Sequence, residues 1–298
     1  MKAFILLVSV LFAGAAHAQF SVQETDGSTR LKVLGKTWNT NFFSLASTET
    51  DHLSDGGRIS TYNYVTFATY IKNSFRMGLR VPFQYNTAGT DRFNGGKVNE
   101  QELMLQDIIV SIQKYDLAYL PWDLGLYWEG RAYAPTSKFS RDTGMITRVR
   151  NQFILSKVFN RYMELEYDNK YSYYLQSRTT YSTSFEDEEG FPVENVAAST
   201  KQQVLEQRLQ LWGKVTPQFG VGWQLGANDE TWNASAENNK NKPVLREWIT
   251  GPSVRFPLND NVNFIFVYED RVDREDADEL GKFYADNTQF TLLSFVRF

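Results

Sequence analysis

The stretch that decides the fold is Phe75-Arg76-Met77-Gly78-Leu79-Arg80-Val81-Pro82-Phe83-Gln84-Tyr85. Every odd-numbered position carries a large apolar side chain, whereas the even-numbered positions carry arginine, glycine, proline or glutamine. Successive side chains of a β-strand point to opposite faces, so a period of two predicts a strand with one apolar and one polar face. The same period recurs within residues 124–131 and 219–226, and no helical periodicity of comparable length competes with it.

Segments of this kind continue along the whole chain and predict about twelve strands, at residues 30–46, 58–71, 73–86, 101–115, 123–134, 146–158, 161–176, 202–216, 218–228, 244–257, 261–270 and 287–298. The connections between them alternate between short and long. The long ones are predicted near residues 47–57, 87–100, 135–145, 177–201, 229–243 and 271–286. Sorting of loops by length is typical of transmembrane barrels, whose turns are short on one side of the membrane and long on the other.

Composition excludes several classes of protein. The 298 residues include no cysteine and two histidines, so a disulfide scaffold and a zinc–cysteine site are excluded, and no cofactor or metal motif is present. The formal charge of −4 has the wrong sign for a protein that binds nucleic acid. The chain is nevertheless rich in rings, with 22 Phe, 16 Tyr and 7 Trp, although its mean hydropathy of −0.42 is polar. Many rings at low mean hydropathy indicate strands with alternating faces rather than a solid apolar core.

Residues 1–18 read MKAFILLVSVLFAGAAHA, with one cation, an apolar run and the small residues Ala16 and Ala18 around His17. This order predicts a secretory signal peptide that is cleaved before Gln19, which leaves residues 19–298 as a single domain. No other stretch approaches the length of an apolar spanning helix. If the exported chain spans a membrane, a closed barrel is the remaining structure that satisfies its backbone hydrogen bonds.

The chain ends on Phe298, after Phe290-Thr291-Leu292-Leu293-Ser294-Phe295-Val296-Arg297. Here the sequence resembles the bacterial outer-membrane β-barrel proteins, whose last strand ends in an aromatic residue preceded by alternating apolar residues; Ser294 interrupts that spacing. The resemblance implies an all-β fold, a transmembrane antiparallel barrel with short periplasmic turns and long extracellular loops. It also implies that Phe298 is the signal recognised by the barrel-assembly machinery. No motif of a particular subfamily is present.

Rings at the strand ends fit the two membrane interfaces, where amphipathic side chains prefer to lie. We expect one such group near the long-loop ends, formed by Phe43, Tyr85, Trp232 and Trp248.

The polar faces predict the lining of the barrel. Twelve strands about 4.8 Å apart and tilted by about 40° enclose a backbone diameter of roughly 24 Å, so side chains decide whether the lumen is open. The predicted pore lining is charged and comprises Arg76, Arg80, Glu129, Arg131, Arg148, Arg150, Glu164, Glu166, Asp168, Glu206 and Arg208. The function that this lining favours is passive, porin-like diffusion of small hydrophilic solutes across an outer membrane.

Two arrangements of these charges are open. Separated basic and acidic walls would create a field across a water-filled pore, whereas charges paired between neighbouring strands would tend to plug it. Arg76 and Arg80 lack an obvious adjacent acidic strand, which favours a pore. Ile265, Val267, Leu293 and Phe295 fall on the same predicted inner face. Either those strands contain a bulge that exchanges their faces, or one wall of the lumen is apolar.

Two other functions compete with a channel. A non-conducting structural or adhesive barrel would use its acidic loops, predicted at residues 186–189 and 269–279, to meet an external partner. A barrel enzyme would need His52, the one histidine left after signal cleavage, beside Asp51 and Ser54. Scarcity of histidine makes the non-enzymatic functions preferable. The residues indicate no particular solute, ion selectivity, loop partner or oligomeric state.

Overall fold

The structure is a computed structural model that describes residues 21–25, 28–33, 36–49, 58–71, 75–90, 97–98, 101–186, 192–216, 218–233, 244–259, 261–274 and 288–297. The predicted signal peptide, His52 and Phe298 therefore lie outside the described residues.

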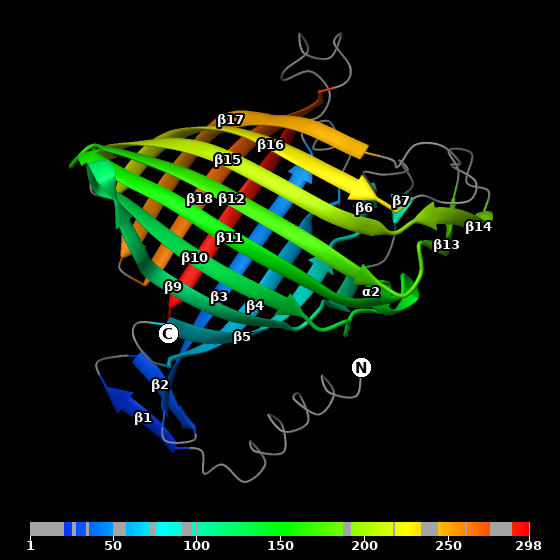
Figure 1. Ribbon diagram of the computed structural model, residues 1–298, viewed down its shortest axis with the longest axis horizontal. Helices are drawn as coiled ribbons and strands as arrows, with labels where there is room; N and C mark the ends of the chain where they lie inside the picture. Colours follow the sequence, from blue (N-terminus) through cyan, green and yellow to red (C-terminus); the bar gives the residue numbers. More distant parts are fainter. Residues whose placement is uncertain are drawn as a thin grey trace.

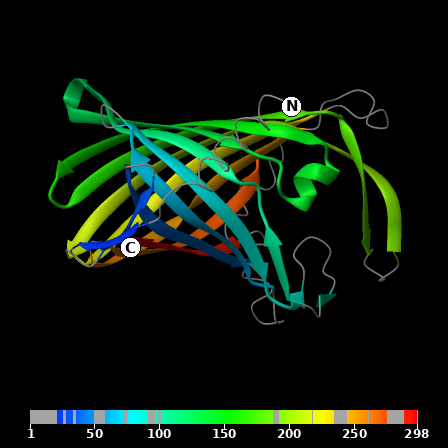
Figure 2. The same cartoon turned by 90° about the horizontal axis from the view of Figure 1, so that it is seen from below.

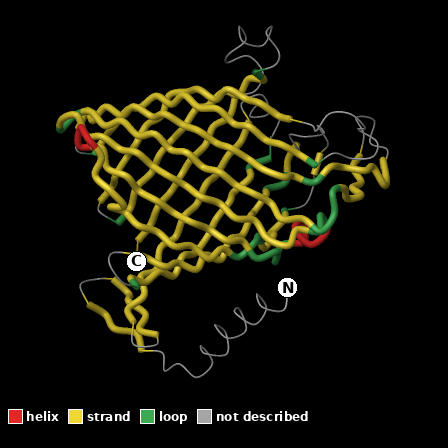
Figure 3. Tube along the Cα trace, in the orientation of Figure 1, coloured by secondary structure: helices red, strands yellow, loops and turns green. Residues whose placement is uncertain are grey.

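Twelve strands form a closed antiparallel barrel (Figures 1 and 3). They are β3 (Lys36–Glu49), β4 (Ser60–Tyr70), β5 (Phe75–Asn86), β9 (Ile109–Leu120), β10 (Leu124–Tyr133), β11 (Met145–Asn160), β12 (Met163–Gln176), β15 (Lys201–Thr216), β16 (Phe219–Trp232), β17 (Val244–Asn259), β18 (Val262–Asp273) and β19 (Thr288–Arg297). Each pairs with the next along the chain, and β19 pairs with β3 from Gln289↔Glu49 to Arg297↔Asn41, which closes the sheet. The predicted twelve-stranded barrel is confirmed.

The loops are sorted by length between the two rims, as predicted. The short-turn rim holds the connections at residues 71–74, 121–123, 161–162, 217–218 and 260–261. The long-loop rim holds those at residues 50–59, 87–108, 134–144, 177–200, 233–243 and 274–287. Figure 2 shows the long-loop rim, where the hairpin of β13 (Thr180–Glu186) and β14 (Pro192–Ser199) projects beyond the barrel.

Smaller elements lie at the two rims. At the short-turn rim, β1 (Ser21–Thr25) and β2 (Ser28–Val33) form a hairpin that pairs with the start of β3, and a 3₁₀ turn, η1 (Pro121–Asp123), joins β9 to β10. At the long-loop rim lie β6 (Gly89–Thr90), β7 (Lys97–Val98), β8 (Glu102–Leu105) and the short helix α2 (Lys138–Asp142). In the part of the chain that the structure describes, no helix is long and apolar enough to cross a membrane.

Burial along the strands is the reverse of that in a water-soluble protein. Outward-facing Leu209, Trp223 and Leu225 are 43%, 51% and 51% exposed, whereas inward-facing Glu129 and Gln224 are 1% and 3% exposed. An apolar outer face and a polar inner face are typical of transmembrane barrels.

Two predicted strands differ from the structure. The first was expected over residues 30–46, where the structure has the end of β2, up to Val33, and then β3 from Lys36 to Glu49. Residues 101–115 were expected to be continuous, but the wall is formed there by two pieces, β8 and β9, which both pair with β5 and are separated by residues 106–108. The pairing register shifts by one residue between the two pieces, from Phe83↔Leu105 to Phe75↔Lys114. Strand β9 then continues past the expected turn at residue 116, to Leu120.

Candidate functional site: the lumen of the barrel

All eleven residues of the predicted pore lining lie on inward faces of the barrel. Arg76 and Arg80 come from β5, Glu129 and Arg131 from β10, Arg148 and Arg150 from β11, Glu164, Glu166 and Asp168 from β12, and Glu206 and Arg208 from β15. The strand register places several of them directly opposite one another, as in Arg131↔Arg150 and Asp168↔Arg208.

Glu129 is the most buried of these charges. Its carboxylate forms ion pairs with Arg80 and with Arg131, the latter at 2.5 Å, and accepts a hydrogen bond from the Gln113 amide at 2.5 Å. Two arginines and an amide therefore satisfy one carboxylate at a point where its side chain is 2% exposed.

The adjacent strands β4 and β9 place no acidic residue beside Arg80, but Arg80 nevertheless reaches a carboxylate. Glu129 lies two strands away; Arg80 is opposite Ile109 on β9 and Glu129 is opposite Gln113, so the diagonal between the two charges passes the small side chain of Ser111. The longer arginine side chain spans this position. Arg76, by contrast, donates to the Gln113 amide oxygen at 3.1 Å and to the Tyr115 hydroxyl at 3.0 Å, and pairs with no carboxylate among the described residues.

A second group of charges connects β11, β12 and β15. Lys170 lies 3.0 Å from Asp168 and 3.6 Å from Glu206, and Arg150 lies 3.3 Å from Glu206. The sequence analysis missed Lys170, although it follows Glu164, Glu166 and Asp168 at the same spacing of two.

A third group extends the charges to β18. Glu269 lies 3.3 Å from Arg208 and 2.8 Å from Arg271, and Arg271 lies 3.8 Å from Glu247 on β17. Glu269 was expected in an acidic surface loop, which is wrong because β18 runs on to Asp273 and turns Glu269 into the lumen. Val267, Glu269 and Arg271 continue the period of two, and that spacing could have identified the longer strand.

Nearer the short-turn rim, Glu164 lies 3.6 Å from Arg255, whose guanidinium stacks over the ring of Trp212 at 4.2 Å. Glu166 lies on the same face of β12, between Glu164 and Asp168.

Eight of the eleven predicted charges thus form ion pairs, and the described residues do not divide into separate acidic and basic walls. We call the inward side chains that these contacts join the charged wall: Arg80, Gln113, Glu129, Arg131, Arg150, Gln152, Asp168, Lys170, Glu206, Arg208, Gln224, Glu269 and Arg271. Neutral amides link the ion pairs, since the Gln152 amide donates to Asp168 at 2.9 Å and the Gln224 amide to Glu269 at 2.9 Å.

The opposite side of the lumen is apolar. We call Phe43, Leu45, Tyr64, Leu293 and Phe295, on β3, β4 and β19, the apolar wall. The register from β18 through β19 and β3 to β4 is continuous, so no bulge exchanges the faces, and the alternative of one apolar wall holds. Phe43 was expected at the membrane interface, which is wrong: its ring stacks on Tyr64 at 4.6 Å and meets Phe295 edge-on at 4.9 Å. The same expectation is wrong for Trp232, which faces the lumen and lines a cavity at the long-loop rim.

Two cavities enter the lumen from opposite rims. The cavity at the long-loop rim has a volume of about 470 Å³, and the cavity near the short-turn rim about 350 Å³. Tyr64 and Arg80 line both cavities, and the Arg80 guanidinium lies 5.2 Å from the centre of the Tyr64 ring. These two residues, on the neighbouring strands β4 and β5, therefore lie where the two cavities adjoin.

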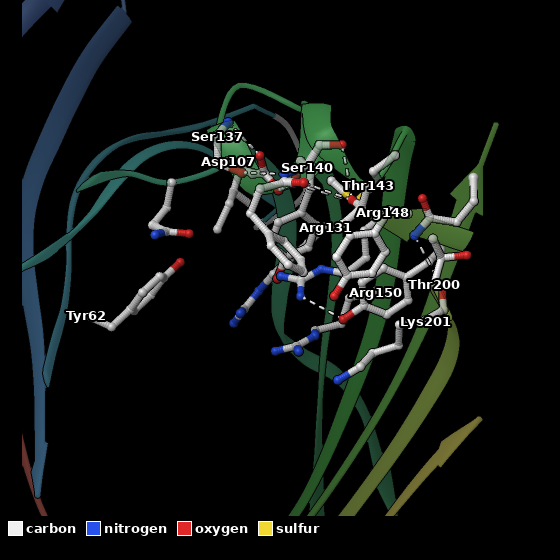
Figure 4. A pocket seen from close by; sticks show the side chains of 18 of the residues that line it. Tyr62, Asp107, Arg131, Ser137, Ser140, Thr143, Arg148, Arg150, Thr200 and Lys201 are labelled. Atoms are coloured by element: carbon white, nitrogen blue, oxygen red, sulfur yellow. Dashed lines mark hydrogen bonds between the residues drawn. The ribbon is translucent and has the colours of Figure 1, made fainter. Parts of the chain in front are cut away.

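Helix α2 covers part of the long-loop cavity (Figure 4). Asp107, in the break between β8 and β9, accepts hydrogen bonds from the Ser137 backbone at 2.9 Å and from the Ser140 hydroxyl at 2.5 Å. The Ser137 hydroxyl in turn accepts from the Ser140 backbone at 3.1 Å, as an N-cap does. The break in the wall thus holds the third long loop over the lumen. Among the described residues, no group of histidine, aspartate and glutamate is arranged to hold a metal ion.

Comparison with known proteins relates the chain to other barrels by structure alone. No family model and no curated protein matches the sequence. The crystal structure of an outer-membrane channel from Pseudomonas putida F1 is similar with a TM-score of 0.57, at 11% identity over 93% of this chain and 100% of that one. The NanC porin, at 10% identity over 87% and 100% of the two chains, has a TM-score of 0.43. The KdgM porin, at 5% identity over 87% and 99%, has a TM-score of 0.41. The chain has the fold of an outer-membrane β-barrel.

Proposed function

We propose that the protein is a porin-like channel of the bacterial outer membrane, through which small hydrophilic solutes diffuse passively. The eleven charges predicted from the sequence line the pore. A polar inner face supports this function, because charges in a hydrated lumen cost far less than charges in a dry core. The likeness of the fold to an outer-membrane channel also supports it.

One observation carries the proposal. The cavities from the two rims both reach Tyr64 and Arg80, so they adjoin at these two side chains. This point is the proposed constriction, whose charges select among solutes.

The proposal includes the placement of the protein. The signal peptide at residues 1–18 directs export and is cleaved before Gln19, and Phe298 is read by the barrel-assembly machinery. The short-turn rim then faces the periplasm and the long-loop rim the exterior, with membrane lipids around the apolar outer face.

Single-channel recording from the refolded protein in a planar bilayer tests this function. We expect discrete conductance steps, and a reversal potential in a salt gradient whose sign reports the charge that controls the constriction. Charge reversal at both Arg76 and Arg80 is expected to shift that potential. A folded barrel that produces no steps would overturn the proposal.

A specific observation favours a second candidate, a non-conducting barrel that acts through its loops. Extensive pairing in the charged wall, together with α2 over the long-loop cavity, would produce a closed lumen. Correctly folded protein that produces no conductance steps in a bilayer would favour this candidate over the channel.

An enzymatic role of His52 is the third candidate. It is tested by lipase and protease assays of the purified protein and of a His52→Ala variant. An activity that the substitution abolishes would replace the channel by a barrel enzyme.

A further inference from the structure

The cavity at the long-loop rim, which we call the vestibule, combines positive charge with rings. Arg80, Arg131, Arg148, Arg150 and Lys201 line it from β5, β10, β11 and β15. Its volume of about 470 Å³ lies within the range of small-molecule sites. The distribution of carboxylates around it decides which solute it suits.

Four of the five cations already have a carboxylate partner. Arg80 is paired with Glu129, Arg131 with the same carboxylate at 2.5 Å, Arg150 with Glu206 at 3.3 Å, and Lys201 with Glu230 at 2.5 Å. Asp107, the carboxylate that lines the vestibule itself, accepts from Ser137 and Ser140 and is thereby engaged with α2.

Arg148 is the exception. No carboxylate among the described residues forms an ion pair with it. Its guanidinium lies 3.5 Å from the centre of the Tyr133 ring and 5.4 Å from that of Tyr174, and one terminal nitrogen donates to the Tyr174 hydroxyl at 3.1 Å. Its Nε is buried without a hydrogen-bond partner, as is that of Arg131, so the lack of a paired carboxylate is what distinguishes Arg148. Two rings therefore hold a planar cation whose charge no carboxylate among the described residues neutralises.

The rings that line the rest of the vestibule favour an anionic solute that also carries an apolar group. Tyr62 extends from β4, on the other side of the lumen, toward the arginines (Figure 4). Phe139 of α2 and Tyr181 of β13 meet edge-to-face at 5.9 Å, and Trp232 adds a further ring. A flat apolar group can pack on these faces while a carboxylate reaches the guanidinium.

We infer that the vestibule binds small organic carboxylates with a flat apolar body, and that Arg148 is the residue that recognises the carboxylate. The inference rests on the proposed channel function, to which it adds the class of solute that is concentrated at the outer mouth. Arginine suits this role because its fork of donors matches both oxygens of a carboxylate.

Calorimetric titration of the full barrel in nonionic detergent tests the inference, with titration into empty micelles as the blank. Benzoate is the probe. Benzamide has the same ring but no charge, and acetate has the carboxylate but no ring. We expect benzoate to bind at least about tenfold more tightly than either, since both the charged contact and the ring contact contribute. Equal binding of benzamide and benzoate would overturn the inference without the use of any variant.

A matched pair of variants locates the site. Arg148→Gln is expected to weaken benzoate binding about tenfold, because the substitution removes one charged contact to the carboxylate. Arg161→Gln removes the same charge and a similar arginine–tyrosine stack, over Tyr162 at 4.5 Å, but lies at the short-turn rim and is expected to bind benzoate as the wild type does. An equal loss in both variants, or no loss in Arg148→Gln, would overturn the assignment.

Failure of this inference and failure of the channel are distinguishable. Benzoate binding to a barrel that does not conduct would retain the vestibule site and remove the channel. Conductance steps from a barrel that does not bind benzoate would retain the channel and remove the site.

Discussion

The charged wall and the apolar wall face each other across one lumen, yet different interactions hold them. In the charged wall, Glu129 satisfies Arg80 and Arg131 at the same time, and Lys170 joins Asp168 to Glu206. In the apolar wall, stacked and edge-on rings of Phe43, Tyr64 and Phe295 fill the equivalent space.

The difference teaches that strand alternation determines which side chains face inward but not how they interact. Both walls obey the same period of two, and the apolar wall does so without a register shift. Arg80 and Tyr64 are the two residues at which the walls meet. Substitutions on either side of that contact can break or sharpen the comparison.

The largest effect is expected from Glu129→Gln, which leaves Arg80 and Arg131 without their shared carboxylate. Breaking a buried ion pair costs about 3–5 kcal/mol, because an uncompensated charge remains. Urea unfolding of the barrel in lipid vesicles measures the loss. Glu164→Gln is the control, since its partner Arg255 is more exposed, and a cost of about 1 kcal/mol is expected. Equal losses in the two variants would contradict a special role for Glu129.

The next largest effect is expected from a pair of β19 variants, whose free energies of unfolding test whether the apolar wall faces the lumen or lipid. Leu292 and Leu293 are neighbours on β19, but Leu293 faces inward with Phe295 whereas Leu292 pairs with outward-facing Phe266. Leu292→Arg is expected to destabilise the barrel by about 2–4 kcal/mol, the cost of a cation on the lipid face near the bilayer midplane.

Leu293→Arg is expected to cost about 1 kcal/mol or less, because the lumen accommodates a cation. The two variants are compared in the same unfolding assay. A reversed order would place the apolar wall against lipid.

Arg80→Ala is expected to change transport as well as stability, because it removes one of the two arginine partners of Glu129 and leaves Arg131 as the other. It also removes one of the two side chains at which the cavities adjoin, so we expect single-channel conductance to rise about twofold as the constriction widens. Arg161→Ala, at the short-turn rim, should leave conductance unchanged. Identical conductance of the wild type and Arg80→Ala would show that the constriction lies elsewhere.

The smallest effect is expected from Phe43→Leu, which keeps apolar volume but removes the ring between Tyr64 and Phe295. Aromatic pairs contribute about 0.5–1.5 kcal/mol beyond their buried area. The free energy of unfolding is expected to fall by about 1 kcal/mol. Outward-facing Phe266→Leu should cost less if ring stacking in the lumen carries the effect.

Most of the barrel could be predicted because alternation and loop length are local properties. Ten of the twelve strands lie close to their predicted ranges, and all eleven predicted lining residues face inward. The break at residues 106–108 could not be predicted, because it depends on how β5 pairs with two different pieces. Glu269 was misplaced for a related reason: an acidic stretch was interpreted as a loop although its spacing continued a strand.

The partners of the charges were beyond local inference. Arg80 reaches Glu129 across β9, and Arg208 reaches Glu269 on β18, three strands away from β15 around the barrel. Such pairs form only when closure and register bring distant strands together. Neither can be read from the spacing of residues along one strand.

By itself the sequence determined the number of strands, the face on which each side chain lies and the sorting of the loops, because each follows from the period of two and from turn residues close by. Only the tertiary structure decided that the charges are paired, that one wall is apolar and that Arg148 lacks a carboxylate partner among the described residues. Those features depend on distances across the lumen, which the closed sheet sets.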